Sequence, residues 1–155
     1  MSDEKKFDFK PLLIGKTETE IIQHEKDTVL RIPGMLFKAK NPDTDAVTYD
    51  IDECNVKAEA DGIFFLAPLN LPHGAEILSV VVTGNAGATA ETYDLYRLNP
   101  DTFVGTILAT ANIGTQTDTI TLGIIDNHTF IYYFATSSLD TDDMIYGAKI
   151  IYKRG

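Results

Sequence analysis

The stretch that decides the fold is LAPLNLPHGAEILSVVVTG, residues 66–84, in which an apolar run ends in turn formers and a new strand begins. Pro68 and Pro72 cannot donate backbone hydrogen bonds to a sheet, so they end the first run. Gly74 can supply the positive φ of a tight turn, and a strand then re-enters the core. The core-facing positions predicted for that strand are Leu78, Val80 and Val82. His73 then lies at the exposed tip of a corner, and we interpret it as a turn residue rather than a catalyst.

Alternation with a period of two recurs from residue 28 to the end, as in half-buried strands. Runs of this kind are AVTYDID (46–52), TDTITLG (117–123) and IYGAKIIY (145–152). The core-facing side predicted for the last run comprises Tyr146, Ala148, Ile150 and Tyr152. Short strands at intervals of about 8–12 residues, without any long helical period, predict an all-β, antiparallel, jelly-roll-like β-sandwich of roughly 8–10 strands.

Composition limits the function classes. The chain has 155 residues, the size of one domain, and a formal net charge of −10. Nucleic acids and anionic membranes require a basic surface, so neither is an expected partner. The single cysteine, Cys54, permits no intrachain disulfide, and we expect a buried thiol. The N-terminus has no apolar stretch typical of a signal peptide, so we expect synthesis in the cytosol without general secretory export.

Residues 1–27 differ from the rest and form a predicted N-terminal arm, followed by a sandwich domain over residues 28–155. Thr17 and Glu20 have the spacing of a capping box, which favours a short helix over about residues 18–26. The arm is too apolar for a solvated tail, its apolar residues being Phe7, Phe9, Leu12, Leu13 and Ile14. We therefore expect it to dock on its own sandwich or on a neighbouring subunit, and the main prediction takes the neighbouring subunit.

No motif of catalysis is present. The histidines at 24, 73 and 128 have no partner at metal-binding or catalytic spacing along the chain, and no nucleophile motif marks a serine. We therefore predict that the protein is not an enzyme and has no organic cofactor. The SLDTDD loop offers Asp140, Asp142 and Asp143, which predict either acidic turn residues or a structural calcium site.

The run TFIYYFAT (129–136) is apolar or aromatic on both faces. A central strand covered on both sides explains this pattern, and so does an outer face that binds another subunit through Ile131 and Tyr133. Tyrosines on such a face could also stack on sugar rings, although the chain lacks the tryptophan on which carbohydrate platforms commonly rely.

Residues 28–155 resemble a poorly characterised family of single-domain jelly-roll sandwiches found among bacterial and phage-type structural and surface proteins. The segments that carry the resemblance are TVLRIPGMLF (28–37), FLAPLNLPHGAEI (65–77), YDLYRLN (93–99), DNHTFIYYF (126–134) and IYGAKIIY (145–152). The resemblance implies a display or assembly module.

The main functional prediction is therefore a self-associating subunit of a virion, a head or tail fibre, or a surface filament, with copies of itself and other particle proteins as partners. Its expected location is a virion or another assembly outside the cell. The alternative is a module that binds glycans or cell surfaces through tyrosines and aspartates at the loop end of the sandwich.

Overall fold

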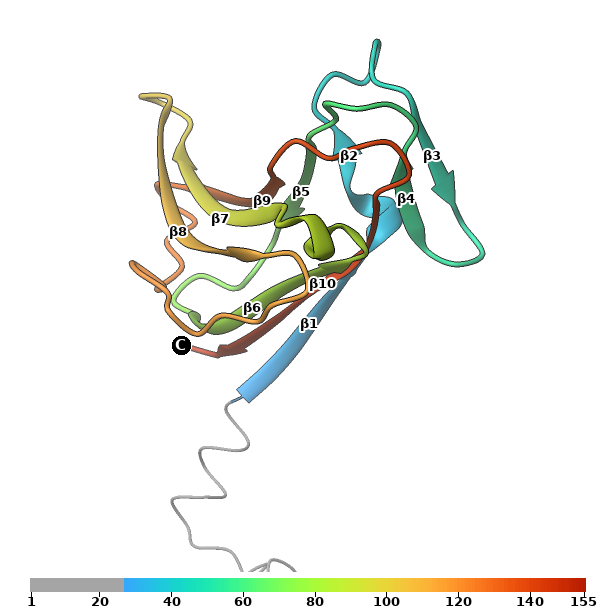
Figure 1. The fold of residues 1–155 in the computed structure, drawn as a ribbon. Helices are drawn as coiled ribbons and strands as arrows, with labels where there is room; N and C mark the ends of the chain where they lie inside the picture. Colours follow the sequence, from blue (N-terminus) through green and yellow to red (C-terminus); the bar gives the residue numbers. More distant parts are fainter. Residues whose placement is uncertain (1–26) are drawn as a thin grey trace, which may run out of the picture.

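The computed structural model describes residues 27–155, apart from the side chains of residues 88 and 89. Two antiparallel five-stranded sheets make up the fold (Figure 1). The prediction of an all-β, jelly-roll-like sandwich is thereby confirmed. The predicted arm helix over about residues 18–26 and the five apolar arm residues lie outside the described residues.

The first sheet is organised around the closing strand β10 (Met144–Lys153). One edge of β10 pairs with β6 (Glu76–Gly84), and the other pairs with β1 (Asp27–Pro33). At its start β10 also pairs with β4 (Asn55–Ala58), which continues to β3 (Val47–Asp50). The two ends of the described chain therefore lie side by side in this sheet, because β1 and β10 are neighbours.

The second sheet, called here the β9 sheet, carries the candidate site. Its strands in spatial order are β2 (Lys38–Ala39), β5 (Phe65–Leu69), β9 (Ile131–Thr136), β7 (Thr92–Asn99) and β8 (Val104–Asn112). Two short 3-10 helices, η3 (Gly34–Leu36) and η4 (Ala86–Thr89), occur in the connections. Every strand pairing is antiparallel, as hairpins and Greek-key connections produce.

The core lies between the sheets and receives alternate residues from each strand. From the β9 sheet it takes Phe65, Ala67, Leu69, Tyr93, Leu95, Tyr132 and Phe134. Tyr93 is fully buried, and its hydroxyl donates to the Val80 carbonyl on β6 (3.0 Å) and to the Thr115 carbonyl (2.7 Å). Desolvation raises the pKa of Tyr93 from 10.0 to about 12. The hydroxyl thus connects the two sheets through the core.

The alternation that buries these residues leaves the other side chains of β5, β7 and β9 on the outer face. Tyr133 and Ala135 on β9 point outward because Tyr132 and Phe134 point inward. One face of the β9 sheet therefore packs in the core, and the other face carries an aromatic surface.

The predicted strand at TDTITLG (117–123) is wrong. Thr117 forms only an isolated bridge with Val80, and residues 117–123 contain no strand. Instead, the Gly123 carbonyl accepts a hydrogen bond from the Ile77 amide (2.9 Å), and the Thr121 amide donates to the Leu108 carbonyl (2.9 Å). The segment therefore bonds to β6 at both ends and to β8 in between, and it cannot alternate along either strand.

Two β-bulges change which residues face the core, so two of the predicted core faces are wrong in part. The pairing of β10 with β6 shifts between Ile145 and Gly147, which turns Tyr146 to solvent, whereas Ala148, Ile150 and Tyr152 are buried as predicted. A second shift in the same pairing places Ile77 in the core instead of Leu78. An extra residue in one strand reverses the facing of the residues beyond it, and the period of two alone does not reveal it.

The expected buried thiol is also wrong, because Cys54 is exposed. It lies in the turn between β3 and β4 with φ of 57°, and its thiol donates to the Ile51 carbonyl (3.6 Å). The tight hairpin requires a residue in the left-handed region here, and this requirement decides the position of the side chain.

Candidate functional site

Two adjoining hollows form a groove across the outer face of the β9 sheet. Their volumes are about 610 and 500 Å³, and both are lined by Leu66 and Tyr133. The larger hollow continues along β5 and β9 toward Asn127, and the smaller one reaches β7 and Lys40. We call this combined surface the sheet groove and define it by Lys40, Leu66, Asp94, Tyr96, Ile131 and Tyr133. A groove of this size can accept a ligand larger than a single small metabolite.

A pair of tyrosines lies at the middle of the sheet groove. Tyr96 on β7 and Tyr133 on β9 are directly opposite in the strand register. Their rings stack with centroids 5.2 Å apart and planes 9° apart, and both side chains are half-buried. Desolvation raises the pKa of Tyr96, and the charge of Asp94 raises it further. Its hydroxyl therefore stays protonated at neutral pH and can donate.

Polar groups border the aromatic pair at the β7 side. The Asp94 carboxylate accepts hydrogen bonds from the Thr110 hydroxyl (2.6 Å) and from the Tyr96 hydroxyl (3.4 Å). The Lys40 ammonium lies over the Phe64 ring, 5.2 Å from its centroid. The smaller hollow thus combines an apolar floor with one anionic and one cationic group.

At the opposite end the sheet groove is bordered by an amide. The side-chain nitrogen of Asn127 donates to the Leu71 carbonyl (2.8 Å), which fixes its orientation. Close by, the Arg97 guanidinium stacks on the Phe130 ring at 3.9 Å. The loop that carries Asn127 and Phe130 is therefore held at this end by contacts to Leu71 and to β7.

Of the residues predicted for an interface, Ile131 and Tyr133 both lie in the sheet groove, and Ile131 is 51% exposed. Asp94 and Tyr96 were not singled out from the sequence. Their signal is the alternation in YDLYRLN, which places Tyr93 and Leu95 inward and the other two outward. Only the register of β7 against β9 brings Tyr96 to Tyr133.

The acidic loop is arranged differently from the prediction. Asp140 and Asp143 converge with Glu91, with ligand oxygens within 4.8 Å of one another. Asp142 points instead to Lys57, whose ammonium is 3.8 Å away. Desolvation raises the pKa of Asp140, and the charges of neighbouring carboxylates raise it further. These oxygens are ligands that calcium prefers, and the calcium site at Asp140, Asp142 and Asp143 stays a prediction, although Glu91 and not Asp142 lies beside the other two carboxylates.

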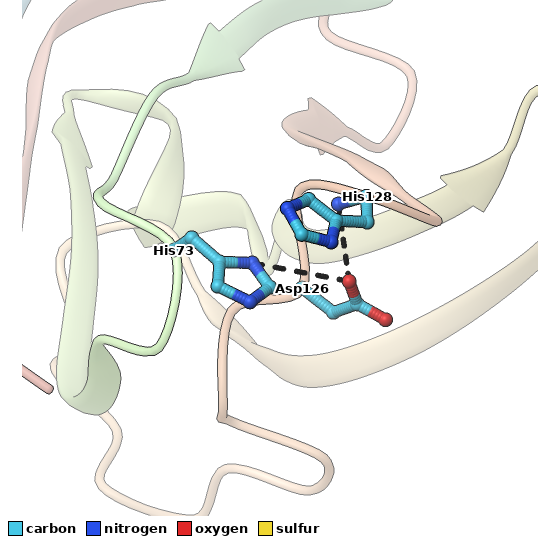
Figure 2. Close-up of side chains that lie close together, drawn as sticks. All are labelled: His73, Asp126 and His128. Carbon is cyan, nitrogen blue, oxygen red and sulfur yellow. Dashed lines mark hydrogen bonds and ion pairs between the residues drawn. The ribbon is translucent and has the colours of Figure 1, made fainter.

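A second cluster joins His73 to Asp126 and His128 (Figure 2). The imidazole rings of His73 and His128 stack at 4.3 Å with planes 12° apart. His73 Nδ1 is 3.9 Å from Asp126 Oδ1, and the His128 amide donates to the same oxygen (3.0 Å). His73 is exposed at a corner, where the sequence placed it, but the fold gives it partners from a distant loop.

Among residues 27–155, no helix is long and apolar enough to cross a membrane.

Comparison with known proteins finds likeness in structure and none in sequence. No family model and no curated protein matches the chain. One similar solved structure is the C-terminal CBM6 of LamC, a marine laminarinase from Zobellia galactanivorans, at 14% identity and a TM-score of 0.44, covering 79% of this chain and 98% of that one. Another is the xylan-binding module CBM15, at 15% identity and a TM-score of 0.41, covering 81% and 96%.

A third is the carbohydrate-binding module CBM6cm-2 from Cellvibrio mixtus lichenase 5A in complex with cellotriose. Its identity is 14% and its TM-score 0.42, with coverage of 81% of this chain and 97% of that one. At such identities and TM-scores the likeness concerns the β-sandwich architecture alone.

These findings correct the main functional prediction. The prediction of a self-associating virion, fibre or filament subunit implied similarity to particle proteins. The similar structures are carbohydrate-binding modules instead. That prediction is wrong, and the glycan-binding alternative agrees better with the findings. The resemblance to β-sandwich proteins holds, without its phage and bacterial-surface component.

Proposed function

We propose that this protein is a non-catalytic carbohydrate-binding module that binds a neutral glycan chain in the sheet groove. The observation that carries the proposal is the stacked pair Tyr96 and Tyr133 in an open groove of apolar and polar residues. The proposal rests on these residues of the chain and not on the distant structural likeness.

Aromatic rings at the surface of a groove suit sugar binding for a physical reason. A pyranose ring presents a face of C–H groups that packs on an aromatic ring, while its hydroxyls project sideways. Tyr133 lies where the two hollows meet, so a ring stacked there can extend into both. The tyrosine hydroxyls add polar tips within reach of sugar hydroxyls.

The polar groups beside the tyrosines supply the directional contacts. Asp94 can accept from a sugar hydroxyl through a lone pair that Thr110 does not use, and Lys40 and Asn127 can donate. A few fixed polar groups around an apolar floor are the usual design of a ligand groove. The site that we propose lies on a sheet face, whereas the alternative drawn from the sequence put glycan binding at the loop end of the sandwich.

The charge of the chain narrows the class of glycan. A net charge of −10 repels polyanions such as polyuronates, and Asp94 contributes a negative charge inside the sheet groove. Neutral polysaccharides have no such penalty. We therefore infer that the ligand is a neutral polysaccharide.

The test measures binding to a panel of neutral β-glucans and xylans, with alginate as the anionic comparison, by affinity gel electrophoresis and calorimetry. Loss of a central aromatic contact typically costs about 2 kcal/mol, so Tyr133→Ala should weaken binding about 30-fold. Tyr146→Ala is the matched control, because Tyr146 is 48% exposed on β10, in the other sheet. Absence of binding to every neutral glycan, or equal losses for both variants, contradicts the proposal.

A further inference from the structure

We propose that His73, Asp126 and His128 form a binding site for a zinc-like divalent transition metal at the corner beside the sheet groove. The inference concerns a separate function, since no residue of this cluster belongs to the tyrosine pair. Its three side chains come from two loops and meet at one point of the surface (Figure 2).

The ligand set matches zinc rather than calcium. Imidazole nitrogen and carboxylate oxygen are zinc ligands, whereas calcium requires six to eight oxygens. One ligand atom of each of the three residues lies within 4.8 Å of the others. Three protein ligands leave a further coordination position for water or another ligand, as in zinc sites that are open to solvent.

The ligand atoms need a small change of distance, and the two stacked imidazoles must rotate apart, because a metal ion lies in the plane of each ring that binds it. His73 Nδ1 and Asp126 Oδ1 are 3.9 Å apart. Two ligands about 2.0–2.1 Å from a tetrahedral zinc ion are separated by about 3.3 Å, so the two atoms must approach by about half an ångström. The side chains of His73 and Asp126 are 50% and 41% exposed, so both can rotate and an ion can reach them from solvent.

Hydrogen bonds around the cluster orient the donors. The Asn127 amide donates to His73 Nδ1 (3.1 Å), so the Nδ1 lone pair is directed at the loop that carries Asp126. The ion would take the place of that amide contact. The His128 amide holds Asp126 Oδ1 at 3.0 Å, as outer hydrogen bonds hold carboxylate ligands in metal sites.

The backbone beneath the cluster is already joined. Gly74 donates to the Ile125 carbonyl (2.8 Å), and Ile125 donates to the Ala75 carbonyl (2.8 Å). The Asp126 amide donates to the Tyr132 hydroxyl on β9 (2.9 Å). The two loops are therefore positioned before any ion binds, and little chain ordering opposes binding.

The composition of the cluster also suits a cation, because Asp126 supplies a carboxylate oxygen beside the two imidazoles. The acidic chain attracts cations in general. The carboxylates at Glu91, Asp140 and Asp143 include no nitrogen ligand, so their cluster favours hard cations such as calcium over zinc.

The test is calorimetric titration of the full chain with zinc chloride at neutral pH in a buffer that does not bind metals. A cobalt(II) titration followed by visible absorption reports coordination independently. Wild type should bind one ion, and His73→Asn, His128→Asn and Asp126→Asn should each weaken binding at least about tenfold. His24→Asn is the matched control and should bind like wild type, because it removes the remaining histidine of the sequence.

Circular dichroism must show that each variant is folded, which the exposure of His73 and His128 favours. The proposal is overturned if wild type does not bind zinc, if His73→Asn and His128→Asn bind as wild type does, or if His24→Asn loses binding. It is also overturned if calcium competes fully with zinc, since the ion would then occupy the carboxylate cluster. None of these outcomes alters glycan binding through Tyr96 and Tyr133.

Discussion

Replacement of Tyr93 by phenylalanine tests how the two sheets are joined. The variant keeps the ring, which is fully buried, and removes the hydroxyl that donates to the Thr115 and Val80 carbonyls. The Val80 oxygen keeps the Thr117 amide as a donor at 2.9 Å, whereas the Thr115 oxygen loses the tyrosine. One buried hydrogen bond and one acceptor left without it predict a loss of about 1–3 kcal/mol in the free energy of unfolding at neutral pH.

The pKa of Tyr93 predicts how this difference changes with pH. In the fold the pKa is raised from 10.0 to about 12, so the fold favours the protonated form. The stability that this provides is complete below about pH 10 and is lost as pH rises through about 12. Phenylalanine does not titrate, so at about pH 11 the advantage of wild type should shrink by about 1.4 kcal/mol.

Urea unfolding followed by far-ultraviolet circular dichroism at neutral pH and at about pH 11 measures both effects. Equal stability of Tyr93→Phe and wild type at neutral pH would refute the hydrogen bonding described for the hydroxyl. An advantage of wild type that is unchanged at high pH would refute the burial argument.

Three further predictions concern stability and are measured by thermal unfolding. Gly34→Ala should lose at least about 2 kcal/mol, because an added Cβ would lie 2.1 Å from the Ile145 carbonyl oxygen, a backbone atom that cannot rotate away; a midpoint like that of wild type would contradict the packing of η3 on β10. Cys54→Gly should gain about 0.5–1 kcal/mol, since φ of 57° strains any residue with a Cβ, and a lower midpoint would count against it. Asp140→Asn should raise the midpoint at neutral pH in EDTA, because the pKa of Asp140 is raised and the fold disfavours its ionised form. This gain in the midpoint should vanish at acid pH, and a gain independent of pH would oppose this reasoning.

The architecture could be predicted from the sequence because its signals are local. Pro72 borders a turn, and Gly74 has φ of 85° in the structure, as the corner required. The expectation that Pro68 ends the strand is wrong, because Pro68 lies within β5, opposite Tyr133, and the strand continues to Leu69. The alternation in TFIYYFAT placed Tyr133 on one face of its strand, and it does lie outward. Such signals depend on neighbours within a few residues, where the side-chain period is fixed.

The site could be predicted only in part, because it depends on pairings between distant segments. The stack of Tyr96 on Tyr133 follows from the register of β7 against β9, which no period reveals. His73 contacts the loop of Asp126 and His128 through the Asn127 amide, and Asn127 is 54 residues away from His73 in the sequence. The sequence alone therefore does not reveal the cluster of His73, Asp126 and His128, because only the fold brings the two loops together.

The most direct test of the glycan-binding account is a titration of the isotope-labelled chain with neutral β-glucan and xylan oligosaccharides, followed by amide chemical shifts in two-dimensional NMR spectra. The account predicts saturable shifts that cluster on β5, β7 and β9, greatest around Tyr96 and Tyr133, and that disappear in Tyr133→Ala but persist in Tyr146→Ala. Shifts confined to the loop end of the sandwich, or no shifts with any neutral oligosaccharide, would contradict it.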